Sequence, residues 1–335
     1  MDRIGIAGAG AWGTALSLVL ARAGRRVALW AYEREVAAAI NTGHENPLYL
    51  PGIALDPAIR ATTELAEIGR AELLLLVTPA QHLRGIAAAL RPHLAQGTPV
   101  LIGAKGIEQH TGALLSEAAA ASLSGAPLAV LSGPSFALEV ARGLPTAVTI
   151  AARDQALGSR LVQTIGSARL RPYLTDDLVG VQIGGAVKNV IAIACGIVAG
   201  RRLGHNTRAA LITRGLAEMA RLGLAMGARA ETFMGLSGLG DLTLTCNDTQ
   251  SRNFSLGIAL GEGRRLKDVL AERHSVAEGV TTAISVVELA GRLGVEMPIS
   301  AAVHAVLHEG AAIDATIEAL LARPFKSEGL AGVSV

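Results

Sequence analysis

The chain has 335 residues, of which 50% are hydrophobic and 17% are charged. This length is enough for two domains with large buried cores. Thirty Lys and Arg oppose 28 Asp and Glu, and the net charge of +2 argues against a general nucleic-acid binder. Two cysteines exclude a disulfide framework, and 39 glycines beside 3% aromatic residues suggest close approaches of the backbone.

The first half of the chain alternates short apolar runs with helical patterns. The apolar runs predict strands over 3–7, 26–30, 73–77, 99–102, 128–131 and 146–150. The patterns between them predict helices over 12–23, 33–41, 79–91 and 111–122, and a further helix and strand are expected over 154–165 and 169–174. Continuous apolar strands alternating with helices are typical of a doubly wound parallel sheet.

The second half contains no strand-like run. Helical patterns cover 178–199, 207–226, 251–261, 266–272, 281–293 and 299–308, and they follow a capping sequence at 175–177. We therefore expect an α/β domain over 1–176, an all-helical domain over 177–325, and a tail over 326–335 that is a candidate for mobility.

Two features bear on the cellular location. The apolar run at 4–7 is too short for a secretory signal, which together with the cysteine usage predicts a cytoplasmic protein. The run 181–200 has the length of a membrane span but contains Gln182, Lys188 and Asn189. Because a lysine near the centre of a span costs about 2.5 kcal/mol or more, we interpret this run as a buried helix.

A glycine-rich turn follows the first predicted strand and opens a helix. Gly8, Gly10 and Gly13 form a G-x-G-x-x-G pattern, in which the first glycine permits the tight turn. The second lets the backbone approach a pyrophosphate, and the third lets the helix pack on the sheet. In this strand–turn–helix setting the pattern predicts a dinucleotide site.

The residues after the second strand should read the adenosine ribose, about 20 residues beyond the glycines. Tyr32, Glu33 and Arg34 are the candidates. Glu33 would bind a 2′-hydroxyl and favour NAD, whereas Arg34 would meet a 2′-phosphate and favour NADP. Both can equally be ordinary charges at a helix start, and the sequence leaves the choice open.

Lys188 is the only cation of the apolar run 181–200. On a helix it is flanked at three and four positions by Gly184 and Gly185, small residues that would open space for a ligand. A desolvated lysine can move protons near neutral pH, as reduction of a ketone requires. The alternative is a lysine that reaches the surface or pairs with a carboxylate.

The densest other glycine cluster, at 235–240, is interpreted as a loop that places Asp241. Asp241 would hold a lysine ammonium or a substrate hydroxyl, unless it merely caps a helix. Ser251, Arg252 and Asn253 begin a predicted helix and could bind phosphate, although a capping serine beside a solvated arginine is the simpler interpretation. The eight histidines show no metal-ligand spacing, so no metal site is expected.

Taken together and in this order, these segments resemble the bacterial NAD(P)-dependent glycerol-3-phosphate dehydrogenases. The resemblance extends from Gly8 to about Arg323. Its most specific segments are 8–16 (GAGAWGTAL), 104–108 (AKGIE), 132–140 (SGPSFALEV), 186–196 (AVKNVIAIACG), 235–246 (GLSGLGDLTLTC), 251–253 (SRN) and 276–279 (VAEG).

The resemblance implies a Rossmann-type domain and an all-α domain like the C-terminal domain of 6-phosphogluconate dehydrogenase. It implies that Lys188 accepts the proton when sn-glycerol 3-phosphate is oxidised and donates it when dihydroxyacetone phosphate is reduced. Hydride transfer would require the nicotinamide, the substrate carbon and Lys188 to meet in a cleft between the two expected domains. The implied substrate contacts are Lys105, Gly133, Ser135, Lys188, Asp241, Ser251, Arg252 and Asn253, with Asn189 and Thr245 as weaker candidates. The implied cofactor contacts are Gly8, Gly10, Ala11, Trp12, Gly13, Tyr32, Lys105, Ala137, Arg252, Val276 and Glu278.

Two residues depart from many relatives. Ala11 replaces a common serine, and Tyr32 replaces a His or Arg suited to a 2′-phosphate. The resemblance favours NADPH, Tyr32 argues against a strict preference, and the choice between NAD and NADP stays open.

The role that the resemblance implies is supply of glycerol 3-phosphate for phospholipid synthesis. We expect the chain neither to bind nucleic acid nor to span a membrane, and a homodimer is one candidate assembly.

Two alternatives accompany this hypothesis. The first is a related two-domain dehydrogenase for hydroxy acids or sugar acids, which need not have a phosphate-directed Ser251-Arg252-Asn253. The second is a non-catalytic dinucleotide sensor, which would have no use for Lys188 inside an apolar helix.

Overall fold

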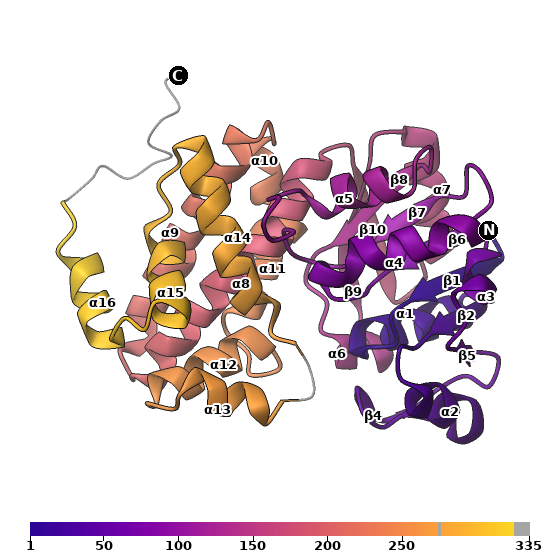
Figure 1. Cartoon of the computed structure of the whole chain (residues 1–335), viewed down its shortest axis with the longest axis horizontal. Helices are drawn as coiled ribbons and strands as arrows, with labels where there is room; N and C mark the ends of the chain where they lie inside the picture. Colours follow the sequence, from indigo (N-terminus) through magenta and orange to yellow (C-terminus); the bar gives the residue numbers. More distant parts are fainter. Residues whose placement is uncertain (274–275, 325–335) are drawn as a thin grey trace. The chain divides into compact units, whose positions relative to one another are not determined.

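The computed structural model describes residues 1–273 and 276–324, which belong to two compact units (Figure 1). The first unit comprises Met1–Lys105 and Ala113–Leu178, and the second comprises Gly106–Gly112 and the chain from Val179 onward. The short segment 106–112 is thus a part of the second unit contributed from within the first half of the sequence. The expected tail over 326–335 lies outside the described residues.

An eight-stranded sheet in the order β10-β9-β8-β7-β6-β1-β2-β5 forms the first unit. Its strands are β1 (Arg3–Ala7), β2 (Arg26–Trp30), β5 (Arg60–Thr62), β6 (Leu73–Leu76), β7 (Val100–Ile102), β8 (Leu128–Ser132), β9 (Thr146–Ala152) and β10 (Leu170–Thr175). A separate antiparallel hairpin consists of β3 (Glu45–Asn46) and β4 (Leu50–Ala54). The sequence predicted neither this hairpin nor β5.

The parallel arrangement that the sequence predicts holds for six strands of the sheet, whereas the last two strands run in the opposite direction. Strand β9 pairs antiparallel with β8 and parallel with β10, whereas β5, β2, β1, β6, β7 and β8 run parallel. The connection from β8 to β9 contains only the five-residue helix α6 (Ala137–Ala141). A connection without a full-length helix suits an antiparallel pair, since parallel neighbours are usually joined through a longer helical crossover.

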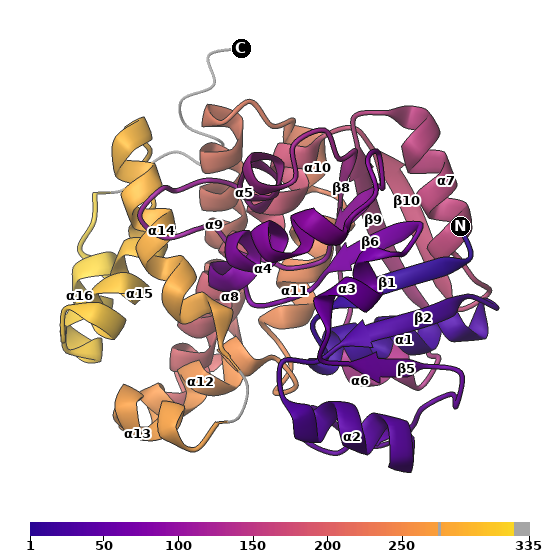
Figure 2. The ribbon, with the colours of Figure 1, turned by 45° about the vertical axis from the view of Figure 1, so that its right-hand side comes forward.

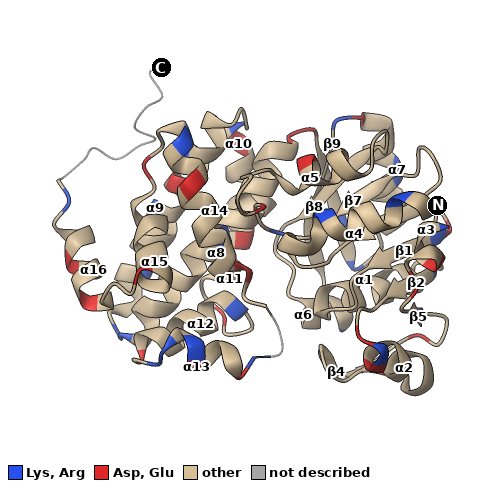
Figure 3. Ribbon diagram, viewed as in Figure 1, with Lys and Arg blue, Asp and Glu red and all other residues tan. Residues whose placement is uncertain are grey.

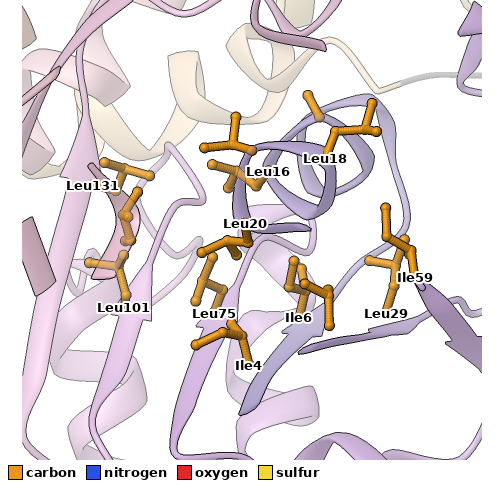
Figure 4. Close-up of a cluster of buried hydrophobic side chains, with 14 of the residues drawn as sticks. Ile4, Ile6, Leu16, Leu18, Leu20, Leu29, Ile59, Leu75, Leu101 and Leu131 are labelled. Atoms are coloured by element: carbon orange, nitrogen blue, oxygen red, sulfur yellow. The ribbon is translucent and has the colours of Figure 1, made fainter. Parts of the chain in front are cut away.

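Helices cover both faces of this sheet. Ile4 and Ile6 of β1 lie in the core beneath α1 (Ala11–Arg22), as Figure 4 shows. Gly5 points to the opposite face, where an added Cβ would lie 2.4 Å from the Ile68 carbonyl oxygen of α3 (Leu65–Gly69). Helices α6 and α7 (Gln155–Ile165) pack with α1, and α4 (Leu83–Leu90) packs with α3 and α5 (Leu115–Ser122) (Figure 2).

The second unit is helical, as predicted. Its helices are α8 (Leu178–Gly200), α9 (Gly204–Ala225), α10 (Ala230–Phe233), η3 (Leu236–Gly240), α11 (Asp241–Thr245), α12 (Arg252–Gly261), α13 (Leu266–Ala271), α14 (Glu278–Leu293), α15 (Pro298–His308) and α16 (Ile313–Leu321). The segment interpreted as a glycine-rich loop is instead the helical turn η3. A Cβ at Gly238 would lie 2.1 Å from the Phe233 carbonyl oxygen, so this glycine serves close packing.

Helix α8 is the one described helix long and apolar enough to span a membrane, and 89% of its most apolar window is buried within the structure. Part of this cover comes from α12. A Cβ at Gly196 would lie 2.2 Å from the Phe254 carbonyl oxygen and 2.8 Å from the Gly257 Cα. The backbones of α8 and α12 therefore cross in contact, which supports the interpretation of α8 as a core helix.

Segment 106–112 is tied to α14 by two hydrogen bonds. Ser285 Oγ donates to the Ile107 carbonyl at 3.1 Å, and Arg292 Nη1 donates to the Thr111 carbonyl at 2.8 Å. These bonds explain why the segment that follows Lys105 belongs to the second unit.

Candidate active-site residues in the two units

The glycine-rich turn of the first unit has the geometry that the pattern predicts. Gly8 has φ +119° and donates its N–H to the Trp30 carbonyl at 3.1 Å. A Cβ at Gly13 would lie 1.8 Å from the Gly8 carbonyl oxygen, whereas one at Gly10 would meet no heavy atom within 4 Å. Helix α1 begins here without an acidic residue in its first turn. The turn therefore offers open backbone and helix N–H groups, and its residues fit a dinucleotide pyrophosphate.

A second cluster forms where β7 and β8 end side by side. Lys105 Nζ donates to the Gly133 carbonyl at 3.0 Å, and Ser135 Oγ donates to the same carbonyl at 2.9 Å. Gly133 has φ +120°, a conformation that glycine adopts readily. Three residues predicted as substrate contacts thus lie together at the carboxyl edge of the sheet, where ligands of such sheets bind. Ala137 begins α6 immediately after this turn.

The end of β2 carries the residues expected to read the ribose. Tyr32 is 80% exposed and makes an edge-on contact with Trp30. Glu33 is the N-terminal capping residue of α2 (Arg34–Gly43). Its Oε1 accepts a hydrogen bond of 2.7 Å from the hydroxyl of Tyr49, a residue that the sequence did not single out.

In the second unit, α8 and α11 bring Lys188 and Asp241 together. Lys188 Nζ lies 2.6 Å from Asp241 Oδ1 and donates to Thr245 Oγ1 at 2.9 Å. The Thr245 hydroxyl also donates to Asp241 Oδ1, at 3.3 Å. Lys188, Asp241 and Thr245 are only 7%, 1% and 4% exposed. Of the roles left open for Asp241, the structure shows that of a carboxylate holding the lysine ammonium.

Gly184 and Cys246 complete the surroundings of Lys188, and Gly184 does not open the space for a ligand that the sequence suggested. The space beside Gly184 is not available to a ligand, because a Cβ there would lie 2.3 Å from the Ser237 carbonyl oxygen of η3. Cys246 is buried next to Cys195, and burial together with that thiol raises the pKa of Cys246 well above its usual value. The Cys246 thiol therefore stays protonated near neutral pH and is unsuited to nucleophilic chemistry.

Asparagine side chains connect α8 with α12 and α14. Asn253 Nδ2 donates to Asn189 Oδ1 at 2.9 Å, and the Gly279 N–H donates to Asn253 Oδ1, also at 2.9 Å. A Cβ at Gly279 would lie 2.6 Å from the Asn189 carbonyl oxygen, so a side chain there would separate the helices. The amide of Asn253 thus fixes the start of α14, where Glu278 lies.

The start of α12 combines a cap with a cation. Ser251 Oγ accepts from the Phe254 N–H at 3.1 Å, the role of a capping serine. The Arg252 side chain is exposed, yet surrounding protein atoms lower the pKa of its guanidinium, and the Glu278 carboxylate opposes that shift. Figure 3 shows further Lys and Arg positions around α12 and α13. Val276, another predicted cofactor contact, is 48% exposed.

The predicted site residues therefore form two sets. The first unit holds those of the glycine turn (Gly8, Gly10, Ala11, Trp12, Gly13), the β2 end (Tyr32) and the β7–β8 edge (Lys105, Gly133, Ser135, Ala137). The second holds Lys188, Asn189, Asp241, Thr245, Ser251, Arg252, Asn253, Val276 and Glu278. The sequence gives no signal for Asn46 and Tyr49, because no spacing or motif marks two residues of an unpredicted hairpin.

A Rossmann-type unit with an open glycine turn and a helical unit with a buried Lys–Asp pair define a nicotinamide-dependent oxidoreductase of the two-domain type. The comparisons with known proteins are more specific. Residues 3–158 match the family model for the NAD-dependent glycerol-3-phosphate dehydrogenase N-terminus. Residues 177–318 match the model for the C-terminus of the same family.

Individual relatives agree with these matches. Two proteins named glycerol-3-phosphate dehydrogenase [NAD(P)+] are similar over nearly the whole chain. The one from Parvibaculum lavamentivorans is 58% identical over 97% of this chain and 98% of its own, and the one from Rhodospirillum rubrum is 59% identical over 98% and 95%. The crystal structure of glycerol-3-phosphate dehydrogenase from Coxiella burnetii has a TM-score of 0.93 at 41% identity and covers 96% of this chain and 99% of its own. The chain belongs to the NAD-dependent glycerol-3-phosphate dehydrogenase family.

Proposed function

We propose that this chain reduces dihydroxyacetone phosphate to sn-glycerol 3-phosphate with NADH or NADPH, and catalyses the reverse oxidation. The observation that carries the proposal is the buried ammonium of Lys188, held 2.6 Å from Asp241 Oδ1. Carbonyl reduction needs a proton donor, because hydride addition to carbon places negative charge on the oxygen.

The chain's own residues supply the proton and the positioning. A bound nicotinamide cofactor supplies the hydride for the carbonyl carbon. In reduction, Lys188 donates a proton from Nζ to the oxygen that gains charge, and in oxidation the neutral amine accepts that proton from the hydroxyl. Asp241 balances the charge of the ammonium, and Thr245 Oγ1 accepts a second hydrogen bond that fixes the direction of Nζ.

The phosphate of the substrate is assigned to the start of α12. Ser251, Arg252 and Asn253 lie there, and Arg252 is an exposed cation that can bond to two phosphate oxygens. The N-terminal N–H groups of the helix add favourable partial charge. Lys105, Gly133 and Ser135 complete the proposed substrate contacts from the first unit.

The cofactor is assigned to the first unit, with additional contacts from the second. The open backbone beside Gly10 supports a pyrophosphate position at the glycine turn. The further proposed contacts are Gly8, Ala11, Trp12, Gly13, Tyr32, Lys105, Ala137, Arg252, Val276 and Glu278.

The test is an initial-rate assay of the purified chain with dihydroxyacetone phosphate and either reduced cofactor. We expect turnover with the phosphorylated ketone and a large loss with dihydroxyacetone, which lacks the phosphate. Arg252→Ala should raise KM for dihydroxyacetone phosphate, and so reduce the difference in turnover between the phosphorylated and the unphosphorylated ketone. A preference for hydroxy acids or sugar acids would support the alternative dehydrogenase. Cofactor binding without turnover on any substrate would support a sensor instead.

We further propose a cytoplasmic location, a role in supplying glycerol 3-phosphate for phospholipid synthesis, and a homodimeric assembly. Both cysteines are buried free thiols, which suits a reducing compartment. Cell fractionation tests the location, and light scattering coupled to size-exclusion chromatography tests the dimer.

A further inference from the structure

The end of strand β2 connects the glycine turn with the carboxylate of Glu33. The Trp30 carbonyl of β2 accepts the N–H of Gly8, and Glu33 follows three residues later as the capping residue of α2. In folds of this type the adenosine ribose of a dinucleotide bound at the glycine turn reaches the residues just beyond β2. Glu33 thus occupies the place where the 2′ substituent of the ribose is read.

The β3–β4 hairpin is fastened to the same turn by Asn46. Its side chain is fully buried, and Nδ2 donates to the Ala9 carbonyl and to Thr14 Oγ1, both at 2.8 Å. Asn46 Oδ1 accepts the Tyr49 N–H at 3.2 Å. These bonds fix the hairpin, and with it the backbone of Tyr49, relative to the glycines that bind the phosphates.

Tyr49 holds the Glu33 carboxylate. The Tyr49 hydroxyl donates to Glu33 Oε1 at 2.7 Å. Burial and the neighbouring carboxylate raise the pKa of Tyr49 to about 12, so the hydroxyl keeps its proton and remains a donor. Among the described residues, Glu33 Oε2 has no hydrogen-bond partner, and it is available as an acceptor. The carboxylate is therefore oriented by the protein before any ligand binds.

We propose that Glu33, positioned by Tyr49, makes this chain selective for NAD(H) over NADP(H). Glu33 accepts a hydrogen bond from the 2′-hydroxyl of the adenosine ribose, and its charge repels a 2′-phosphate. The selection rests on the proposed nicotinamide-dependent reaction and assigns its cofactor. Like charges brought together in a partly buried site repel each other. Exclusion of the 2′-phosphate therefore contributes more to the selectivity than the hydrogen bond to the 2′-hydroxyl does.

Arg34 is the residue that could reverse this selection. It is exposed at the first position of α2, between Glu33 and the exposed Glu35. A guanidinium there could bind a 2′-phosphate, but it is flanked by two carboxylates, of which one is fixed by Tyr49. The local charge of the three side chains is negative, which favours the uncharged 2′-hydroxyl.

The experiment compares kcat/KM for NADH and NADPH with dihydroxyacetone phosphate, together with the Kd of each reduced cofactor from fluorescence titration. We expect wild type to prefer NADH by about tenfold or more, equivalent to ~1.4 kcal/mol. Glu33→Gln should reduce that ratio, mainly by improving NADPH. Tyr49→Phe should shift it in the same direction by less, because the carboxylate remains but is no longer held. The matched control Glu35→Gln removes the same charge two residues away and should lower the ratio by much less than Glu33→Gln does.

Three outcomes would overturn the proposal. They are a wild-type preference for NADPH, an unchanged ratio in Glu33→Gln, and a selective loss of NADPH use in Arg34→Ala. The Kd values separate this proposal from the proposed reaction. If neither cofactor is turned over but NADH still binds more tightly than NADPH, the reaction fails and the selectivity stands.

Discussion

Lys188 Nζ lies 2.6 Å from Asp241 Oδ1, and both side chains are almost completely buried. A buried pair of this kind contributes little net stability, because desolvation of the two charges offsets their attraction. Breaking it by removing one partner is costly, since the other charge remains in an apolar setting. The pair is therefore better explained by its chemistry than by stability, and the two roles can be separated by mutation.

Lys188→Met should lose both turnover and stability. Removal of the proton donor should lower kcat by about 100-fold or more. The buried Asp241 carboxylate, which then lacks the ammonium of Lys188, should lower the free energy of unfolding by about 3–5 kcal/mol. The double variant Lys188→Met/Asp241→Asn should regain much of that stability without regaining turnover. Urea unfolding and initial rates on all four members of the cycle measure both effects. Near-normal turnover in the double variant would remove Lys188 from the proposed mechanism.

Alanine should have opposite effects on stability at two helical glycines, because only one of them lies where α8 crosses α12. Alanine at Gly196 would bring its Cβ to 2.2 Å from the Phe254 carbonyl oxygen, so the helices must separate. We expect a loss of about 1–3 kcal/mol in the free energy of unfolding, despite the better helix propensity of alanine.

Gly291 of α14 is the matched control for Gly196. It lies within a helix of the same unit, and an added Cβ there would meet no heavy atom within 4 Å. Gly291→Ala should raise the free energy of unfolding by up to ~1 kcal/mol. Equal stabilisation in both variants, measured by urea unfolding, would contradict the close crossing of α8 and α12.

Alanine substitutions at two glycines of the turn, Gly10 and Gly13, should affect cofactor binding and folding differently. A Cβ at Gly10 is free of contacts, so Gly10→Ala should change stability by less than about 1 kcal/mol. Its methyl group would occupy the approach of the pyrophosphate, and we expect the Kd for NADH to rise by about tenfold or more. Isothermal titration calorimetry measures the affinity.

Gly13→Ala should instead damage the fold of the first unit. Its Cβ would lie 1.8 Å from the Gly8 carbonyl oxygen, so the turn or α1 has to move. A drop in melting temperature, measured by circular dichroism, should accompany the loss of binding. A normal melting temperature in Gly13→Ala would show that the helix is not pressed against the turn.

The parts of the fold that the sequence predicts well are those with a strong periodic signal. The strands over 3–7 and 26–30 agree residue for residue with β1 and β2, because apolar runs bounded by turns define their limits. The direction of β9 was not predictable, since a strand buried on both faces has the same pattern in either direction. The three-residue strand β5 is too short to give a pattern at all.

The site shows the same division between local and non-local information. The geometry of the glycine turn could be predicted because its glycines have fixed local roles. The glycines at 235–240 suggested a loop, but at Gly238 the missing side chain makes room for the Phe233 backbone. Contacts between distant residues, such as Tyr49 with Glu33, depend on the hairpin that brings them together. No spacing rule predicts such contacts.

A buried carboxylate outside the proposed site predicts a specific dependence of stability on pH. Glu218 of α9 accepts hydrogen bonds from the N–H groups of Ile299 and Ser300 and from the Ser300 hydroxyl, and so caps α15. Burial raises the pKa of Glu218, and it outweighs these three donors, which lower it. The folded state therefore binds a proton at Glu218 at higher pH than the unfolded state does.

The sign of the effect follows from this difference in proton binding. The stability that Glu218 contributes is fully present below its ordinary pKa and is lost as the pH rises through the raised pKa of the folded state. Glu218→Gln remains uncharged throughout. The free energy of unfolding of wild type minus that of Glu218→Gln should therefore decrease as the pH rises from mildly acidic to neutral.

Urea unfolding of both proteins over a pH series measures this difference. Glu318→Gln, at an exposed glutamate of α16, is the control, and its difference from wild type should stay nearly constant with pH. An increase with pH for Glu218→Gln would mean that the three hydrogen bonds stabilise the carboxylate more than burial destabilises it. In that case Glu218 caps α15 as an ion, and its pKa in the folded protein lies below the ordinary value.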